Sequence, residues 1–232
     1  MTRIILSILT VVLFNTIYAQ KPVATPGILS SKQIDMIFPD SVKHRLGITY
    51  PVYRVYQYSD RSGKYYCILT ESSDSVNHKG DTLNHFIRAV TCKIGSGGLE
   101  KIREMNDQVT EGPNEEDNIW FWTKYIEFAD YDNDGLVEPL IIYGSTGMNG
   151  HDDGRIKFLI YYKDQKIAIR HQNGVLDFER ETRVDKGFYL LPLRLQSSVK
   201  QKMGEMEKRD QAIFPRGWQA AMKERKTVFN ER

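Results

Sequence analysis

"NIWFWTKYIEFADYDNDGLVEPLIIYG", residues 118–144, is the stretch that decides the fold. Two runs of aromatic and branched apolar residues, 118–128 and 138–144, stand on either side of a loop built from Asp, Asn and Gly. Aromatic and β-branched side chains favour strands, and Asp, Asn and Gly favour the turn between them. The stretch therefore predicts an antiparallel hairpin with an acidic loop at its tip.

Strand-like runs of the same kind continue on both sides of this hairpin. Their apolar residues alternate with a period of two, and turn-forming residues separate them. The further predicted strands are 48–58 paired with 64–72, 85–94, 99–109, 155–162 paired with 166–172, and one within 180–193.

Helical periodicity is confined to the two ends of the predicted domain. Residues 38–48 predict a short helix that Asp40 or Ser41 caps and Gly47 ends. The spacing of apolar residues then predicts two C-terminal helices at about 196–229, separated at Pro215. Strands come first and helices last, which disfavours a parallel α/β fold. We therefore expect an α+β fold, mainly antiparallel β, with a sheet or open barrel of about eight strands and two C-terminal helices.

The first residues predict export. Residues 1–19 carry one charge, Arg3, followed by an apolar run too short to span a bilayer, and we expect cleavage after Ala19. Residues 20–31 contain two Pro, a Gly and Ser and predict a flexible leader, which leaves 32–232 as a single β-rich domain. We expect the mature protein in the periplasm, at the cell surface or secreted, with no membrane span after cleavage.

The charge balance narrows the class of partner. The chain has 32 basic and 30 acidic residues, and removing Arg3 leaves 31 against 30, a net charge of +1. This balance gives no electrostatic case for a nucleic acid or an anionic membrane. Cys67 and Cys92 lie in strand-like runs, so a disulfide and two small buried thiols both stay open.

The acidic loop has the spacing of a calcium-binding wrap. Asp130, Asp132 and Asp134 occupy alternate positions, and Gly135 supplies the bend at the sixth position. The carbonyl of Leu136 and the carboxylate of Glu138 follow at the seventh and ninth positions. Ile141 at the twelfth position and the flanking strands exclude an EF-hand. The alternative is a turn of solvated acids.

Two resemblances extend this interpretation. The spacing DxDxDGxxE between strands resembles the calcium loops of FG-GAP/VCBS-type β repeats, which implies Ca²⁺ and the ligands Asp130, Asp132, Asp134, Leu136 and Glu138. More broadly, "YSDRSGKYYCILTE" (58–71) and the later "W…FADYDNDGLVEPLIIYG" are similar to a family of small exported bacterial proteins filed under surface polysaccharide biosynthesis. That resemblance implies a setting in the cell envelope and no catalytic residues.

A second polar region is predicted at the opposite end of the sheet. The Gly-rich loop 144–155 follows a strand of about 20 Å, so its acids should lie far from the acidic loop. The residues predicted to share this rim are Glu115, Glu116, Asp117, His151, Asp152 and Asp153. They could bind sugar hydroxyls, hold a second metal or perform acid–base chemistry, or they could be solvated loop residues. Trp120 and Trp122 lie two apart in a strand and could form a sugar-stacking platform or belong to the core.

These features favour three functions in order. The first is a non-catalytic binding module stabilised by one calcium ion, with a glycan or an envelope protein as partner. The second is an enzyme of surface glycan metabolism that uses Glu115, Glu116, Asp152 and Asp153 of the rim. The third is a structural component of the envelope. The sequence contains no Ser-His-Asp signature, phosphate loop or nucleotide fingerprint, which places the enzyme second.

Overall fold

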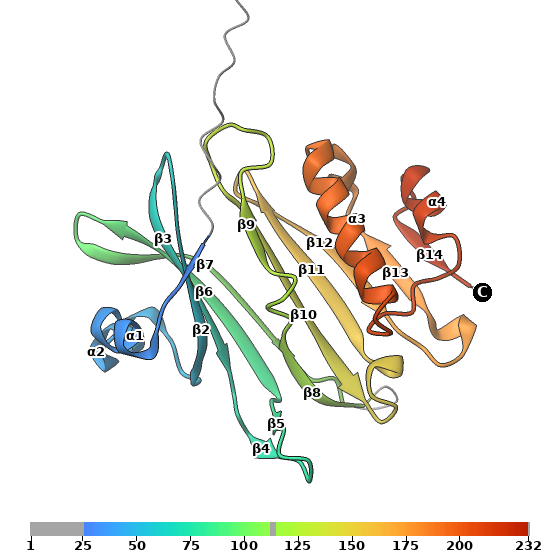
Figure 1. Cartoon of the computed structure of the whole chain (residues 1–232), viewed down its shortest axis with the longest axis horizontal. Coiled ribbons are helices and arrows are strands. Elements are labelled where there is room, and N and C mark those ends of the chain that lie inside the picture. Colours follow the sequence, from blue (N-terminus) through green and yellow to red (C-terminus); the bar gives the residue numbers. More distant parts are fainter. Residues whose placement is uncertain (1–25, 112–114, 232) are drawn as a thin grey trace, which may run out of the picture.

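Two antiparallel sheets pack face to face in the computed structural model of the protein, which describes residues 26–111 and 115–231 (Figure 1). A pair of helices covers the outer face of each sheet, so the order of layers is helices, sheet, sheet, helices. The α+β class with mainly antiparallel strands and C-terminal helices is therefore confirmed. The strands form two main sheets, neither of which is closed into a barrel.

The N-terminal sheet has the strand order β1-β2-β3-β6-β7. Its strands are β1 (Gly27–Ile28), β2 (Val52–Asp60), β3 (Gly63–Glu71), β6 (Phe86–Gly95) and β7 (Gly98–Gln108). The helices α1 (Ser31–Ile37) and α2 (Asp40–Leu46) cover its outer face. A small hairpin of β4 (Ser75–Val76) and β5 (Thr82–Leu83) interrupts the connection from β3 to β6.

The C-terminal sheet has the strand order β14-β13-β12-β11-β10-β8, and β9 also pairs with β10. Its strands are β8 (Glu116–Phe121), β9 (Glu127–Ala129), β10 (Glu138–Gly147), β11 (Arg155–Tyr162), β12 (Gln165–Gln172), β13 (Glu181–Val184) and β14 (Val228–Asn230). The helices α3 (Leu193–Glu207) and α4 (Trp218–Lys223) cover its outer face. Three short 3-10 helices are η1 (His151–Asp153), η2 (Asp177–Glu179) and η3 (Lys186–Leu190).

Alternation of side chains along the strands fills three cores. In β10, Leu140 and Ile142 face α3 and α4, whereas Ile141 and Tyr143 face the N-terminal sheet. A strand whose side chains are buried on both faces reads as a continuous apolar run, and β10 has this character along most of its length. The layered packing thus follows from strands that are apolar on both sides.

The predicted hairpins are confirmed, including β2 with β3 and β11 with β12. The hairpin around the acidic loop is also confirmed, although residues 122–126 divide its first arm into β8 and β9. The N-terminal helix at 38–48 appears as α2, and Gly47 ends it with a φ of 71°.

Three assignments near the ends were wrong. Residues 20–25 of the predicted flexible leader lie outside the described residues, but Gly27 and Ile28 pair with β2, and Ser30 caps α1 through a capping box with Gln33. The first C-terminal helix ends at Glu207. The second ends at Lys223. The last residues of the predicted helical region form the strand β14 instead, because they pair with β13 and extend the C-terminal sheet at that edge. The predicted signal peptide, 1–19, lies outside the described residues. Among the helices that are described, none has the length and apolar character needed to cross a membrane.

The two cysteines are free and buried. Cys92 lies opposite Tyr66 in the pairing of β3 with β6, and Cys67 lies opposite Thr91. Neighbouring residues of a strand point to opposite faces, so Cys67 enters the core between the sheets and Cys92 enters the core under α1 and α2. Their side chains point away from each other, which excludes the disulfide.

Candidate metal centre

The loop between β9 and β10 gathers four carboxylates at one end of the C-terminal sheet. One oxygen each from Asp130, Asp132, Asp134 and Glu138 can be chosen so that all four lie within 4.8 Å of one another. The described residues contain no other group of His, Cys, Asp and Glu gathered in this way. The acidic cluster could therefore hold a metal ion, as the spacing in the sequence predicts.

The backbone of the loop turns around these carboxylates. Asp130 accepts hydrogen bonds from the amides of Asp134 (3.1 Å) and Gly135 (2.8 Å). Gly135 has a φ of 84°, a left-handed conformation that glycine adopts without strain. The amide of Leu136 donates to Asp134 Oδ1 at 2.8 Å. These bonds hold the carboxylates on the inner side of the curve.

Glu138, the first residue of β10, is the most buried acid of the group. It is 2% exposed, and its Oε2 accepts a hydrogen bond of 2.7 Å from the amide of Tyr131. Burial, together with the negative charges of Asp132, Asp130 and Asp134, raises the pKa of Glu138 to about 7. A cation among these acids would oppose that shift, because it favours the ionised carboxylate.

The β11–β12 turn supplies the positive charge that lies next to the loop. Lys163 Nζ is 3.5 Å from Asp132 Oδ2 and 4.0 Å from Asp134 Oδ2. The hydroxyl of Tyr162 also donates to Asp132 Oδ2, at 2.9 Å. One exposed ammonium group thus faces a cluster that carries several negative charges.

The loop also joins three separate parts of the fold. The amide of Arg61, in the β2–β3 turn, donates to the carbonyl of Gly135 at 2.9 Å, and Asp60 Oδ2 accepts from the amide of Val137 at 3.3 Å. From α3, Arg194 Nη1 donates to Asn133 Oδ1 at 3.3 Å. The acidic loop therefore lies where both sheets and α3 meet (Figure 1).

The predicted rim is at the opposite end of the sheet, but Glu116 is used there as an ion-pair partner. It is buried, and it accepts hydrogen bonds from the amide of Thr110 (2.8 Å), from Arg155 Nε (2.7 Å) and from the hydroxyl of Ser145. Arg155 continues to Asp107 in β7, at 3.2 Å. This network ties the two sheets together and occupies the carboxylate that an acid–base role would need.

The other rim residues are either exposed at the surface or partly buried within the Gly-rich loop 144–155. Glu115, Asp117 and Asp152 are exposed. Asp153 Oδ2 accepts from the amide of Asn149 at 2.9 Å. Burial lowers the pKa of His151, so its imidazole is favoured in the neutral form.

The tryptophan pair does not form an exposed platform. Trp122 is 4% exposed and belongs to the core under α3 and α4, whereas Trp120 is half-buried. Their ring centroids are 5.9 Å apart, and His151 lies 5.8 Å from Trp120 and 5.6 Å from Trp122. The sequence left open a sugar-stacking platform and a place in the core, and the structure places Trp122 in the core.

A pocket of about 300 Å³ borders the acidic loop at the margin between the sheets. Its walls include Leu136, Val137 and Glu138, together with residues of both sheets and their turns. The lining residues from elsewhere in the chain are Tyr58, Asp60, Ser62, Tyr65, Lys93, Arg103, Tyr161, Lys163 and Asp164. No local pattern in the sequence indicates this pocket, because residues from β2, β3, β6, β7 and β11 meet only through the packing of the sheets.

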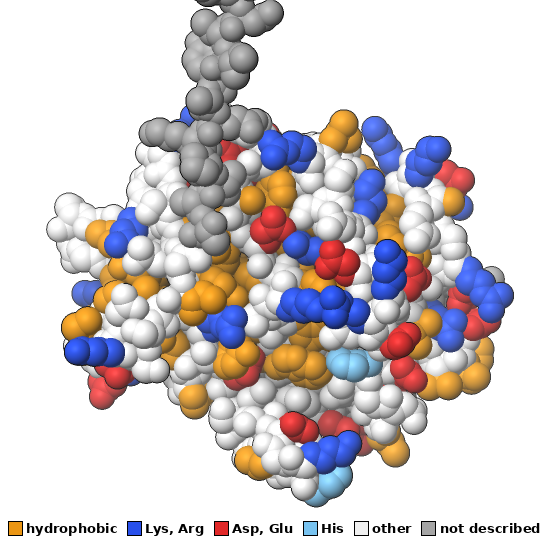
Figure 2. Space-filling view, viewed as in Figure 1, with side chains coloured by type: hydrophobic (Ala, Val, Ile, Leu, Met, Phe, Trp, Pro, Cys, Tyr) orange, Lys and Arg blue, Asp and Glu red, His pale blue; other side chains and the backbone are white. Residues whose placement is uncertain are grey.

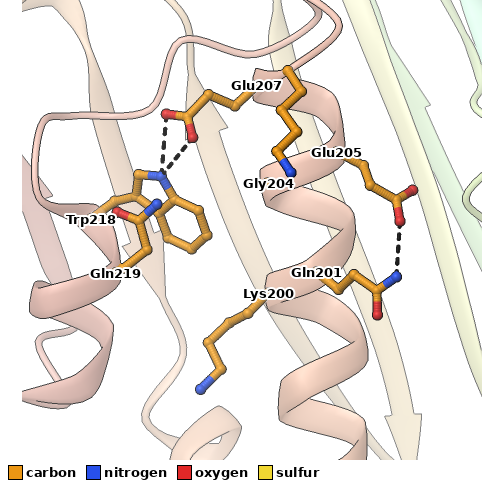
Figure 3. Close-up of a pocket in the computed structure, with 8 residues that line it drawn as sticks. Lys200, Gln201, Gly204, Glu205, Glu207, Trp218 and Gln219 are labelled. Atoms are coloured by element: carbon orange, nitrogen blue, oxygen red, sulfur yellow. Dashed lines mark hydrogen bonds between the residues drawn. The ribbon is translucent and has the colours of Figure 1, made fainter.

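A second hollow, of about 520 Å³, lies between α3 and α4. Figure 3 shows Trp218 beside α3, with its indole nitrogen donating to the carboxylate of Glu207, at 3.3 Å from each oxygen. Gly204 leaves the helix surface open there, since an added Cβ would meet no atom within 4 Å.

On the face shown in Figure 2, basic and acidic side chains are interspersed, in keeping with the near-neutral total charge.

Comparisons of the chain with family models, curated proteins and solved structures find no match.

Proposed function

We propose that this chain is an exported, non-catalytic β-rich binding module whose acidic loop holds one calcium ion. It acts in cell-envelope or surface polysaccharide biology, with a glycan or an envelope protein as its partner. The observation that carries the proposal is the convergence of four carboxylates within 4.8 Å, beside the exposed ammonium group of Lys163. Such an excess of negative charge favours a divalent cation.

The donor atoms favour calcium over other metals. All side-chain donors are carboxylate oxygens, which suit hard cations, and the cluster contains no His or Cys that would favour zinc or copper. Calcium accepts six to eight oxygens in flexible geometry, whereas magnesium requires a near-ideal octahedron. The proposed ligands are Asp130, Asp132, Asp134, Glu138 and the carbonyl of Leu136. Water or a bound ligand would complete the coordination.

The position of the loop explains what the ion would do. The loop forms few hydrogen bonds with the β2–β3 turn and with α3, and Tyr131 and Val137 add apolar contacts with the two cores beside it. An ion that fixes the loop would therefore fix the β2–β3 turn, the β11–β12 turn and the start of α3 relative to one another. The ion has a structural role in this proposal, and binding of a partner takes place on the surface that it orders.

A non-catalytic role is preferred because the best acid of the rim is already engaged. Glu116 forms an ion pair with Arg155 and two further hydrogen bonds, so it has little capacity left for a substrate. Export is supported by the charge and apolar pattern of residues 1–19.

Thermal denaturation in calcium and in chelator tests the metal assignment. A ligand at a hundredfold excess over its Kd stabilises the folded state by about 2.7 kcal/mol. For a domain of this size, that free energy raises the Tm by about 5–10 °C. Asp132→Ala removes one carboxylate from the middle of the loop and should abolish most of the rise. It should cost little in chelator, because it also relieves repulsion among the acids.

Asp152→Ala is the matched control, since it removes an exposed acid at the other end of the sheet. It should keep the full calcium-dependent rise in Tm. Magnesium should give a smaller rise than calcium at equal concentration. If the wild-type protein melts at the same temperature in millimolar calcium and in chelator, the acidic loop is a solvated turn and the proposal is wrong.

A further inference from the structure

We infer that the pocket beside the acidic loop binds a small hydroxylated carboxylate of the uronic acid class. The inference rests on the proposed function in taking the protein to be a binding module, and it adds the site and the chemical class of the ligand. The pocket volume of about 300 Å³ is at the lower end of the range of about 300–1,000 Å³ for small-molecule sites. It therefore suits one sugar unit at a time.

Two basic side chains point from the N-terminal sheet into the space between the sheets. Lys93 lies opposite Tyr65 in the pairing of β3 with β6, and Arg103 lies opposite Thr91 in the pairing of β6 with β7. Tyr65 belongs to the core between the sheets, so Lys93 is on the same inner face. Charged groups on an inner face are unusual unless they have partners.

These two cations are held by aromatic rings more than by acids. Lys93 Nζ lies 5.6 Å from the ring centroid of Tyr65, and it has no ion pair with any acid in the part of the chain that the structure describes. The guanidinium of Arg103 lies 5.2 Å from the ring centroid of Tyr161. Its acidic partner is Asp164, at 3.3 Å, whose side chain is 98% exposed. Exposed pairs of this kind are weak, so a ligand carboxylate could replace Asp164.

The other acids that line the pocket are already engaged. Asp60 Oδ1 accepts from the amides of Ser62 (2.7 Å) and Gly63 (3.2 Å), and its Oδ2 accepts from Val137. Glu138 belongs to the metal cluster. A carboxylate that enters the pocket would thus meet Lys93 and Arg103 as cations without strong partners.

Metal binding would favour the same ligand. Lys163 also lines the pocket, and in the structure its ammonium group lies beside Asp132. A divalent ion among the loop carboxylates would take over the neutralisation of Asp132 and release Lys163 toward the pocket. The tyrosine rings of the pocket offer apolar faces and hydroxyls for the sugar ring.

Binding of glucuronate to the calcium-loaded protein tests the inference. In a titration followed by amide NMR signals, the amides of Ser62, Leu136 and Val137 should shift saturably at millimolar glucuronate. At matched ionic strength, glucose and inorganic phosphate should each bind at least tenfold more weakly. Phosphate binding as tight as glucuronate would overturn the assignment, because the site would then recognise any anion.

Arg103→Gln and Lys93→Gln should each weaken glucuronate binding at least tenfold. Because both variants are tested, the inference remains testable if one of them does not fold. Lys101→Gln is the matched control, because a bulge at Ile102 places Lys101 on the other face of β7, opposite Cys92. It should bind glucuronate as the wild type does. Equal binding of glucuronate by Arg103→Gln and Lys101→Gln would refute the assignment of the pocket.

The failure of the two proposals can be told apart. Arg103→Gln should keep the full calcium-dependent rise in Tm, since it changes no proposed metal ligand. A rise in Tm without glucuronate binding overturns the pocket alone. Glucuronate binding without a calcium-dependent rise in Tm overturns the metal assignment alone.

Discussion

The buried imidazole of His171 is held in its neutral form by its surroundings. His171 is 2% exposed, and its Nε2 lies 2.7 Å from Asn173 Oδ1, an acceptor, so Nε2 carries the proton. Its Nδ1 accepts from the hydroxyl of Thr182 at 2.9 Å. Burial lowers the pKa of His171 to about 4. A buried charge would lack a counterion here, which explains the direction of the shift.

This shift predicts a loss of stability in mild acid. The unfolded chain binds a proton at His171 below about pH 6.5, whereas the folded protein resists it down to about pH 4. The stability that the neutral imidazole contributes is therefore present above pH 6.5 and is lost as the pH falls toward 4. The full loss is roughly 3 kcal/mol. Urea unfolding at several pH values in chelator should show this loss in the wild type.

His171→Gln is the comparison, because an amide of similar reach does not titrate. The free energy of unfolding of the wild type should fall more steeply than that of His171→Gln between pH 6.5 and 4, by the equivalent of one proton. Glu138 titrates in both proteins, with a raised pKa of about 7, and its effect cancels in the difference. Parallel pH profiles would show that His171 takes up a proton in the folded state at its ordinary pKa.

At the scale of single residues, the sequence predicted the members of the acidic cluster and missed their partners. Local spacing is enough to place Asp130, Asp132 and Asp134 around one point. Lys163 reaches the same point from another turn of the sheet, and no local pattern indicates it. Glu116 was assigned to the rim for the same reason, since its partner Arg155 lies 39 residues away in the sequence.

At the scale of elements, α3 contains a glycine that its environment does not require. Gly204 lies inside the 15-residue helix, has no positive φ, and leaves open space where a Cβ would lie. Glycine within a helix costs about 1 kcal/mol relative to alanine. Gly204→Ala should therefore stabilise the protein by about 0.5–1 kcal/mol and raise the Tm by about 1–4 °C. Thermal denaturation in calcium measures the change.

Gly144→Ala, in β10, is the contrasting variant. A Cβ at Gly144 would lie 2.6 Å from the ring of Trp122 and 2.9 Å from the carbonyl of Arg155, so it should lower the Tm. A lower Tm for Gly204→Ala as well would contradict the open space beside Gly204 in the hollow between α3 and α4.

The elements that were predicted correctly have strong local signals. Hairpins combine a period of two with turn residues, and these features decided β2 with β3 and β11 with β12. The helix α1 was missed, although Ser30 and Gln33 are spaced as a capping box. Strand β14 was assigned to a helix because its three residues are too few to show a period, and its pairing with β13 is a tertiary contact.

At the scale of the whole molecule, the two sheets are joined by polar contacts at both ends. The acidic loop joins them at one end, through Asp60 and Arg61 of the β2–β3 turn. At the other end Arg155 and Lys157 of β11 form ion pairs with Asp107 of β7, at 3.2 and 2.6 Å. Between these ends the contact is apolar. The proposed ion would therefore act on one of two separate clamps.

The sequence predicted the fold class but not the division of strands into two sheets. Strands such as β3 are buried on both faces, a pattern that fits the middle of a layered fold as well as one large sheet. Which strands become neighbours depends on packing and on the β4–β5 excursion. The pocket beside the acidic loop is lined by residues of both sheets, so its prediction also requires knowledge of how the sheets pack.

The two-clamp arrangement predicts that calcium protects one end of the molecule. In hydrogen exchange with short labelling times, local openings dominate. Chelation should speed exchange at the amides of Gly135 and Val137 and at Arg61, by up to about a hundredfold when calcium had been at a hundredfold excess over its Kd. The amides of Thr110 and Arg155, which donate to Glu116 and Ser145 at the other clamp, should exchange at an unchanged rate. Asp132→Ala in calcium should match the chelated wild type. Equal acceleration of amide exchange at both ends would show that the ion stabilises the fold as one unit. The prediction that the ion acts locally, at the acidic loop, would then be wrong.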